Sequence, residues 1–246
     1  MVWRPRASAS GYGNVERCEA AMKPMTDKHL AILRRHMVEI VELHFDLASE
    51  EIGKDRADAR VIEAMRRVPR HLFVPGALAG LAYHDTPLPI GFEKTVSQPF
   101  LGALMIDLLG VEPDDHVLEV GTGLGYQAAI LAELAAQVWT VEVVEEFAAA
   151  AELILRQLGA FNVEVRAGDG TRGWPEHAPF DAVLVTAAAR QPPFPLVEQL
   201  KSGGRLVMPI GTDEVQQLTL FTKLDEGRLE VREIMAVRFT KLEVNS

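Results

Sequence analysis

The sequence of 246 residues has very little cysteine: Cys18 is its single copy. One cysteine cannot form a disulfide within the chain, which is typical of proteins from a reducing compartment, so the sequence predicts a cytoplasmic location. The sequence also lacks any uncharged apolar run of about 18 residues, the length that a membrane-spanning helix needs. We therefore expect no membrane partner.

An excess of basic residues is absent as well. The chain has 25 lysines and arginines against 35 acidic residues, a formal net charge of −10. A protein that binds a phosphate backbone usually carries a basic stripe, and none is visible here, so nucleic acid is not an expected partner. The seven histidines include no HExxH or other pair at metal-ligand spacing. The sequence therefore predicts no metal site.

The N-terminal part is expected to differ from the rest. Residues 1–25 show neither helical nor strand periodicity and lack the apolar core of a signal peptide, so we expect a disordered leader there. Residues 26–246 are expected to form a single domain, with helices over 26–80. From Thr26 to Ser49 apolar residues recur at helical spacing. Residues 72–96 are rich in proline and glycine and are expected to be irregular.

From residue 116 onward short β-branched runs alternate with helical patterns. The strand-like runs are HVLEVG, QVWTVEVV, NVEVRAG, FDAVLVTA and GGRLVMPIG. Such alternation predicts an α/β fold with a doubly wound, mostly parallel, Rossmann-like sheet that is covered on both faces. The last runs, QQLTLFTKL and LEVREIMAVRFTKL, are joined through DEG and predict an antiparallel C-terminal strand pair.

The segment LEVGTGLGYQ follows a strand and opens a helix. Its glycines, Gly121, Gly123 and Gly125, permit a tight turn and let a ligand lie against bare backbone. The spacing is GxGxG rather than the dinucleotide pattern GxGxxG, and the acidic Glu119 stands beside the loop. Both features favour a nucleotide-like ligand that is not a pyrophosphate.

Two further strand ends carry candidate ligand-binding residues. Glu142 closes the second strand, where an acid can accept both hydroxyls of a ribose. Gly168, Asp169 and Gly170 end the third strand, where an aspartate can accept from an adenine amine. Parallel strands place these ends at one edge of the sheet. The alternative is that all of them are turn glycines and capping acids.

Together these sites resemble the class I S-adenosyl-L-methionine-dependent methyltransferases, and the positive sulfonium of that cofactor suits acidic residues. The motifs IGFEKTVSQPF, VLEVGTGLGYQ, GDG, PFDAVLVTAA, GGRLVMPIG and AVRF follow the order of the protein-L-isoaspartate O-methyltransferase family over about residues 58–242. The resemblance implies a repair enzyme that methylates the free α-carboxylate of L-isoaspartyl residues, and D-aspartyl residues as a further candidate, in damaged proteins.

The resemblance also assigns roles to the opening motif. It implies that Ser97 contacts the substrate carboxylate as the catalytic residue, and that Thr95 and Gln98 border the substrate. The alternative for Ser97 is a helix cap, because a helix is expected over about 98–109 with Pro99 in its first turn. A carboxylate is ionised at pH 7, so Ser97 would align it rather than act as a nucleophile.

Two more positions complete the implied substrate site. Arg238 matches an arginine that lies over the substrate cleft and would bind carboxylate or carbonyl oxygens. Pro209, in the turn expected at Val207–Gly211, would border backbone donors to the peptide. One departure concerns Glu93, which replaces the second glycine of the IGxGxT pattern. If Glu93 lined the acceptor cleft, its charge would oppose an anionic substrate.

Two other functions fit the same fold. One is methylation of a chosen aspartate in a ribosomally made peptide, which activity on a generic isoaspartyl peptide would distinguish. The other is a module that binds the cofactor without turnover. The presence of Ser97, Glu142 and Asp169 argues against that module.

Overall fold

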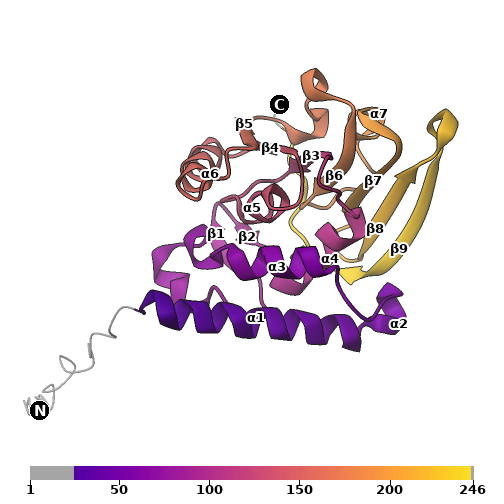
Figure 1. The fold of residues 1–246 in the computed structure, drawn as a ribbon. Helices are drawn as coiled ribbons and strands as arrows, with labels where there is room; N and C mark the ends of the chain where they lie inside the picture. The colour runs from indigo at the N-terminus through magenta and orange to yellow at the C-terminus, as the bar shows by residue number, and fades with distance from the viewer. Residues whose placement is uncertain (1–24, 245–246) are drawn as a thin grey trace, which may run out of the picture.

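The computed structural model of the chain describes residues 25–244, so the predicted leader, except Met25, lies outside the described residues (Figure 1). Within the described range no helix is both long and apolar enough to cross a bilayer. The described chain builds a layered α/β structure around one large sheet.

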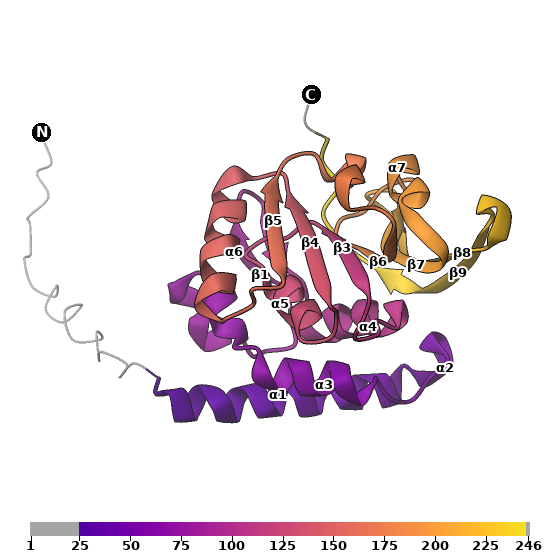
Figure 2. The ribbon, with the colours of Figure 1, turned by 45° about the horizontal axis from the view of Figure 1, so that its top comes forward.

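The large sheet has seven strands in the order β5-β4-β3-β6-β7-β8-β9 (Figure 2). The first five strands in this order run parallel, and β8 is antiparallel to both of its neighbours. The predicted parallel sheet with an antiparallel C-terminal pair is therefore confirmed. Its strands are β3 (His116–Val120), β4 (Gln137–Glu142), β5 (Val163–Ala167), β6 (Phe180–Val185), β7 (Leu200–Gly211), β8 (Gln216–Lys223) and β9 (Leu229–Val237).

Helices and turns cover both faces of the sheet, as the sequence predicts. One face packs against α4 (Pro99–Leu109), α5 (Tyr126–Ala132) and α6 (Glu145–Gln157) around the larger apolar core. The other face packs against α7 (Phe194–Glu198) and a segment containing Trp174 around a second core. Single turns of 3-10 helix lie at η3 (Gly170–Arg172), η4 (Pro175–His177) and η5 (Asp225–Gly227).

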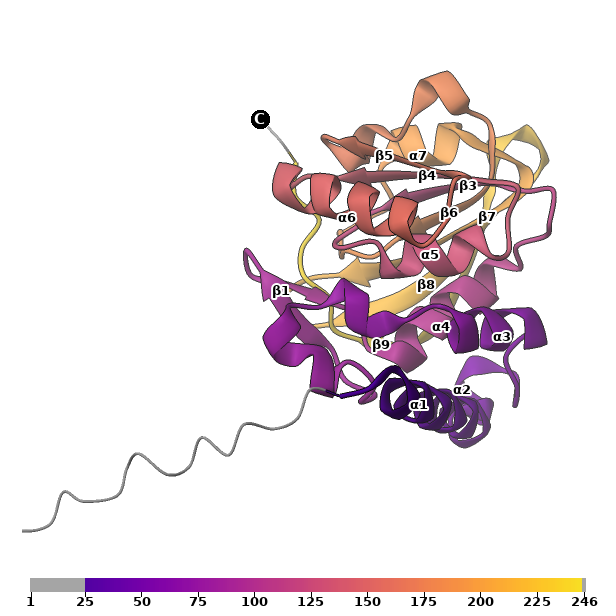
Figure 3. The same ribbon diagram turned by 60° about the vertical axis from the view of Figure 1, so that its left-hand side comes forward.

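The N-terminal helices form an additional layer. They are α1 (Asp27–Leu47), α2 (Ser49–Ile52) and α3 (Ala59–Arg67), and α1 packs against α3 and α4 rather than on the sheet (Figure 3). Helix α1 buries Met37, Val41 and Phe45, as its apolar stripe predicts. Ile40 and Leu47 belong to the same predicted stripe but are exposed, at 40% and 70%.

The segment expected to be irregular is more ordered than the sequence suggests. It contains two 3-10 helices, η1 (Arg70–Phe73) and η2 (Gly76–Leu81), and a hairpin of β1 (Leu88–Gly91) and β2 (Lys94–Val96). The expectation was wrong because such short strands leave no periodicity to read. Glycine and proline lie inside this hairpin instead of interrupting it.

Candidate functional site

Two cavities meet beside the carboxyl ends of the parallel strands. The larger, of about 960 Å³, lies between the end of α1, the segment around Ser97 and residues 235–240. The smaller, of about 70 Å³, lies over the glycine loop. Thr95, Thr186 and Thr240 line both cavities. Ligands placed in the two cavities would therefore face each other across these threonines.

The glycine loop forms the floor of the small cavity. Gly121 and Gly123 line it with φ angles of +94° and +55°, which side chains rarely adopt. The backbone there is bare, as a closely approaching ligand requires. Gly125 lies at the contact with α6, where a Cβ on it would lie 3.3 Å from the Cβ of Ala151. It allows helix packing and does not line the cavity.

Glu142 brings a carboxylate to the same cavity. The side chain is buried, and its oxygens accept from the Gly123 amide at 2.7 Å and the Val144 amide at 3.0 Å. Burial raises the pKa of Glu142, an effect that the backbone hydrogen bonds oppose. A carboxylate has about four lone-pair sites, so two remain for a ligand's hydroxyl groups. These acceptor sites fit the ribose hydroxyls of the implied cofactor.

The end of β5 contributes less than the sequence predicts. Gly170 lines the small cavity, but Gly168 and Asp169 do not. The Asp169 carboxylate accepts from the Thr171 amide at 2.9 Å and from the Thr171 hydroxyl at 2.7 Å, so it caps the turn η3. For Asp169 the geometry in this structure corresponds to the alternative, a capping acid.

Glu119 also lies away from the cavity. It is fully buried on the face of the sheet beneath α4 and α5, where one carboxyl oxygen accepts from the Thr140 hydroxyl at 2.5 Å. Its other oxygen has no hydrogen-bond partner within residues 25–244. Burial raises the pKa of Glu119 to about 8, and the nearby Glu142 adds to the rise. The structure therefore places a neutral acid behind the site rather than a ligand in it.

Four of the five predicted substrate-site residues line the large cavity: Thr95, Ser97, Gln98 and Arg238. Arg238 is exposed just after β9 and forms no ion pair within the described part of the chain. Pro209 is not brought there. It lies buried inside β7, paired with Leu218 of β8, because the expected turn is in fact the end of a long strand.

The helix after Ser97 is capped by a residue far away in sequence. Helix α4 begins at Pro99, and the Asp85 carboxylate accepts from the Phe100 amide and from the Gln98 side chain, both at 2.8 Å. The Ser97 hydroxyl makes no hydrogen bond to residues 25–244, so the cap alternative for Ser97 is wrong in this structure. The hydroxyl is left for a ligand.

A buried arginine supports the same segment from below. Arg70, fully buried in η1, donates to the carbonyl of Ser97 at 2.7 Å and to that of Ala82 at 2.9 Å. Its guanidinium lies 4.7 Å from the ring centre of Tyr126, the residue that opens α5. Arg70 thus connects the Ser97 segment with the helix that follows the glycine loop. Sequence reasoning missed it, since its only signal is a charge within a short apolar motif.

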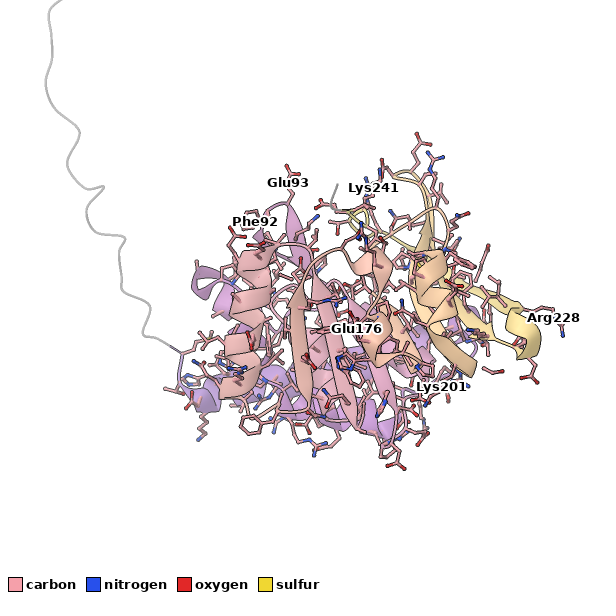
Figure 4. The ribbon with its side chains drawn as sticks, turned by 90° about the horizontal axis from the view of Figure 1, so that it is seen from above. Phe92, Glu93, Glu176, Lys201, Arg228 and Lys241 are labelled. Carbon is pink, nitrogen blue, oxygen red and sulfur yellow. The ribbon has the colours of Figure 1, made fainter. Side chains whose placement is uncertain are left out.

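Glu93 points away from both cavities. It is exposed at the tip of the β1–β2 hairpin, with a φ angle of +57°, and lines neither cavity (Figure 4). The glycine usual at this position is explained by the left-handed backbone. The concern that the Glu93 charge opposes the substrate in the cleft is not supported by this geometry. Its neighbour Lys94 forms an ion pair with Glu243.

Comparison with known proteins identifies similar sequences over most of the chain. A sequence profile described as Protein-L-isoaspartate(D-aspartate) O-methyltransferase matches residues 45–246. A protein-L-isoaspartate O-methyltransferase 1 of a Polaromonas species is 49% identical over 219 residues, covering 89% of this chain and 93% of that protein. One from Syntrophobacter fumaroxidans is 51% identical over 210 residues, covering 85% of each.

Solved structures agree on the fold. A protein-L-isoaspartate O-methyltransferase superposes with a TM-score of 0.72 at 29% identity, covering 85% of this chain and 65% of that one. A structure of a putative Plasmodium falciparum protein of the same description, in complex with S-adenosyl-L-homocysteine, gives a TM-score of 0.70 at 23% identity, covering 87% of this chain and 98% of that one. The second similarity bears on the fold alone.

Proposed function

The chain belongs to the protein-L-isoaspartate(D-aspartate) O-methyltransferase family, and we propose that its two adjoining cavities hold the two reactants of the methyl transfer. The protein is an S-adenosyl-L-methionine-dependent repair methyltransferase that acts on isoaspartyl residues. The observation that carries the proposed placement is that Thr95, Thr186 and Thr240 line both cavities. The methyl group would cross at these threonines.

The cofactor is assigned to the small cavity. When bound, it supplies an electrophilic methyl group on a sulfonium sulfur. Gly121 and Gly123 would lie against it, and the free lone pairs of Glu142 would accept its ribose hydroxyls. The acidic side chain also suits a cationic ligand better than a pyrophosphate.

Cofactor entry requires a local rearrangement. The small cavity, of about 70 Å³, is far below the ~300 Å³ or more that small-molecule sites usually offer. Residues 240–243 line it, and the Lys94–Glu243 ion pair holds this segment to the hairpin. Glu243 is 55% exposed and Lys94 18% exposed, so water partly screens this ion pair. Two backbone hydrogen bonds of 2.8 Å also join Thr240 and Leu242 to Ala188, so enlarging the cavity on this side would break these bonds as well as the ion pair.

The acceptor carboxylate is assigned to the large cavity beside Ser97. It is ionised at neutral pH and needs no general base. Its oxygen would bond to the methyl carbon that the bound cofactor supplies, the electron pair of the broken carbon–sulfur bond would stay on sulfur, and no proton would move. The unpaired hydroxyl of Ser97 would donate to one carboxylate oxygen, and the Arg238 guanidinium would hold the other or a neighbouring carbonyl. These groups align the reactants.

The substrates follow from this chemistry. We propose damaged proteins with L-isoaspartyl residues as the main partners and D-aspartyl residues as a second substrate. The single cysteine supports a cytoplasmic location. The net charge of −10 argues against nucleic acid as a partner.

The test is methyl transfer to an isoaspartyl peptide, with the aspartyl isomer of the same sequence as the matched control. We expect labelled methyl groups on the isoaspartyl peptide and none above background on its isomer. Equal labelling of both peptides would contradict the assigned substrate. Tight binding of S-adenosyl-L-homocysteine without methyl transfer to either peptide would instead support the alternative of a module that binds the cofactor without turnover.

A further inference from the structure

The first helix brings a histidine to the large cavity. His44 lies in the last turn of α1, one residue before the segment that the family profile matches. It lines the cavity together with Ser97 and Arg238. Its side chain is 38% exposed, so a ligand in the cavity can reach the ring.

A buried aspartate determines which ring nitrogen is free. Nδ1 of His44 lies 2.7 Å from an oxygen of Asp85, whose side chain is 6% exposed, although the two groups are not aligned as a hydrogen bond and Nδ1 has no hydrogen-bond partner within residues 25–244. A bare ring nitrogen and a carboxylate oxygen would repel each other at this distance, so a ring proton belongs on Nδ1, and the tautomer that carries it there has its lone pair on Nε2. The Phe100 ring packs edge-on against the imidazole, with ring centres 5.3 Å apart, and limits its rotation.

The same aspartate is bonded to the segment that carries Ser97. As described above, its carboxylate accepts from the Gln98 side chain and from the Phe100 amide. His44 and the segment that follows Ser97 thus both contact Asp85, and the His44 ring lies against Phe100 of that segment. A ligand beside the Ser97 hydroxyl would therefore share the cavity with the His44 ring.

We propose that His44 is a specificity residue whose Nε2 accepts a backbone N–H of the substrate peptide. The proposal rests on the proposed function, because it takes the large cavity to be the peptide site. The acceptor carboxylate has no proton to give and is assigned to Ser97 and Arg238. A peptide also presents backbone N–H groups beside that carboxylate, and Nε2 has no hydrogen-bond partner within residues 25–244.

The first test compares three variants. His44→Leu removes the acceptor, and we expect the KM for an isoaspartyl peptide to rise about three- to tenfold, the effect of one lost hydrogen bond. The kcat and the affinity for S-adenosyl-L-homocysteine should stay unchanged. His44→Gln offers a carbonyl oxygen and should recover part of the loss. His36→Leu, on the same helix but 59% exposed and paired with Glu39, is the matched control.

The second test identifies the donor. A set of isoaspartyl peptides is made, each with one backbone amide N-methylated. One position should raise the KM of the wild type but have no further effect in His44→Leu. An unchanged KM in His44→Leu, or equal N-methyl effects in both proteins, would overturn the role of His44 while the wild type still methylates the unmodified peptide. Failure of the wild type on that peptide would instead overturn the proposed function itself, and this inference with it.

Discussion

At the residue scale, the freedom of Ser97 depends on the capping of α4 by Asp85. A serine two residues before a proline that opens a helix is a candidate for the cap, although Gln98 holds the N-cap position itself. Here Asp85, whose side chain is almost wholly buried, takes that place from 15 residues away, so the Ser97 hydroxyl stays open to the cavity. Local sequence cannot distinguish these cases, because the deciding contact is not local.

Replacing Ser97 with alanine should lower turnover without lowering stability. A hydrogen bond to a charged group contributes about 1.5–3 kcal/mol, so kcat should fall about ten- to a hundredfold. The Tm should stay at the wild-type value, because the hydroxyl holds nothing in the folded protein. Asp85→Ala is the contrasting variant, with an expected loss of about 1 kcal/mol or more from the lost cap. A Tm drop in Ser97→Ala equal to that of Asp85→Ala would contradict this account.

Glu93 gives a second residue-scale prediction. Its φ angle of +57° lies in the left-handed region, which costs a non-glycine residue about 1–2 kcal/mol. Glu93→Gly should therefore stabilise the protein by up to about 1 kcal/mol, since the added chain entropy of glycine offsets part of the gain. The peptide KM should not change, because Glu93 lines neither cavity. Glu93→Ala removes the charge but keeps the backbone strain, so it is the control. Chemical denaturation of both variants would show whether the strain or the charge changes the free energy of unfolding.

At the element scale, the sequence predicted the elements that have periodicity and missed those that lack it. The parallel strands and the glycine loop could be placed because buried strands are continuous apolar runs and the loop has a fixed spacing. The β1–β2 hairpin could not, since its strands are only 4 and 3 residues long. The end of β7 looked like a turn because of Pro209 and Gly211, yet its pairing with β8 continues through both residues.

The buried Glu119 in strand β3 should make the stability of the protein depend on pH. The raised pKa means that the folded state favours the neutral form of Glu119 more than the unfolded state does. Protonation of Glu119 therefore stabilises the folded state fully below pH 4.5, the pKa of a free glutamate, and this stabilisation is lost as pH rises through about 8. Glu119→Gln cannot ionise. Thermal melts should therefore show little difference from the wild type at pH 5 and a higher Tm for the variant at pH 8.

The same variant tests whether Glu119, which the sequence places beside the glycine loop, contributes to cofactor binding. If Glu119 lies behind the site, Glu119→Gln should bind S-adenosyl-L-homocysteine as tightly as the wild type. A large loss of affinity with an unchanged Tm at every pH would place the side chain in the site after all.

At the scale of the whole molecule, the arrangement of the layers makes the site. Helix α1 was predicted from its stripe, but whether its apolar face would meet the sheet, a partner or other helices could not be read from the stripe. Its packing on α3 and α4 places His44 on the cavity wall. The C-terminal segment likewise comes back over the glycine loop from the far edge of the sheet, so Thr240 meets Thr95 and Thr186.

The central claim is that one cavity binds the cofactor, the other binds the acceptor, and they meet at these threonines. The most direct test is a grid of initial rates over cofactor and isoaspartyl-peptide concentrations for the wild type and Glu142→Ala, with Ser97→Ala as the matched comparison. Glu142→Ala should weaken the apparent cofactor affinity by about 1–3 kcal/mol and leave the peptide KM unchanged. Ser97→Ala should lower kcat and leave the apparent cofactor affinity unchanged. A Glu142→Ala variant with normal cofactor affinity and an altered peptide KM would contradict the assignment of the two cavities.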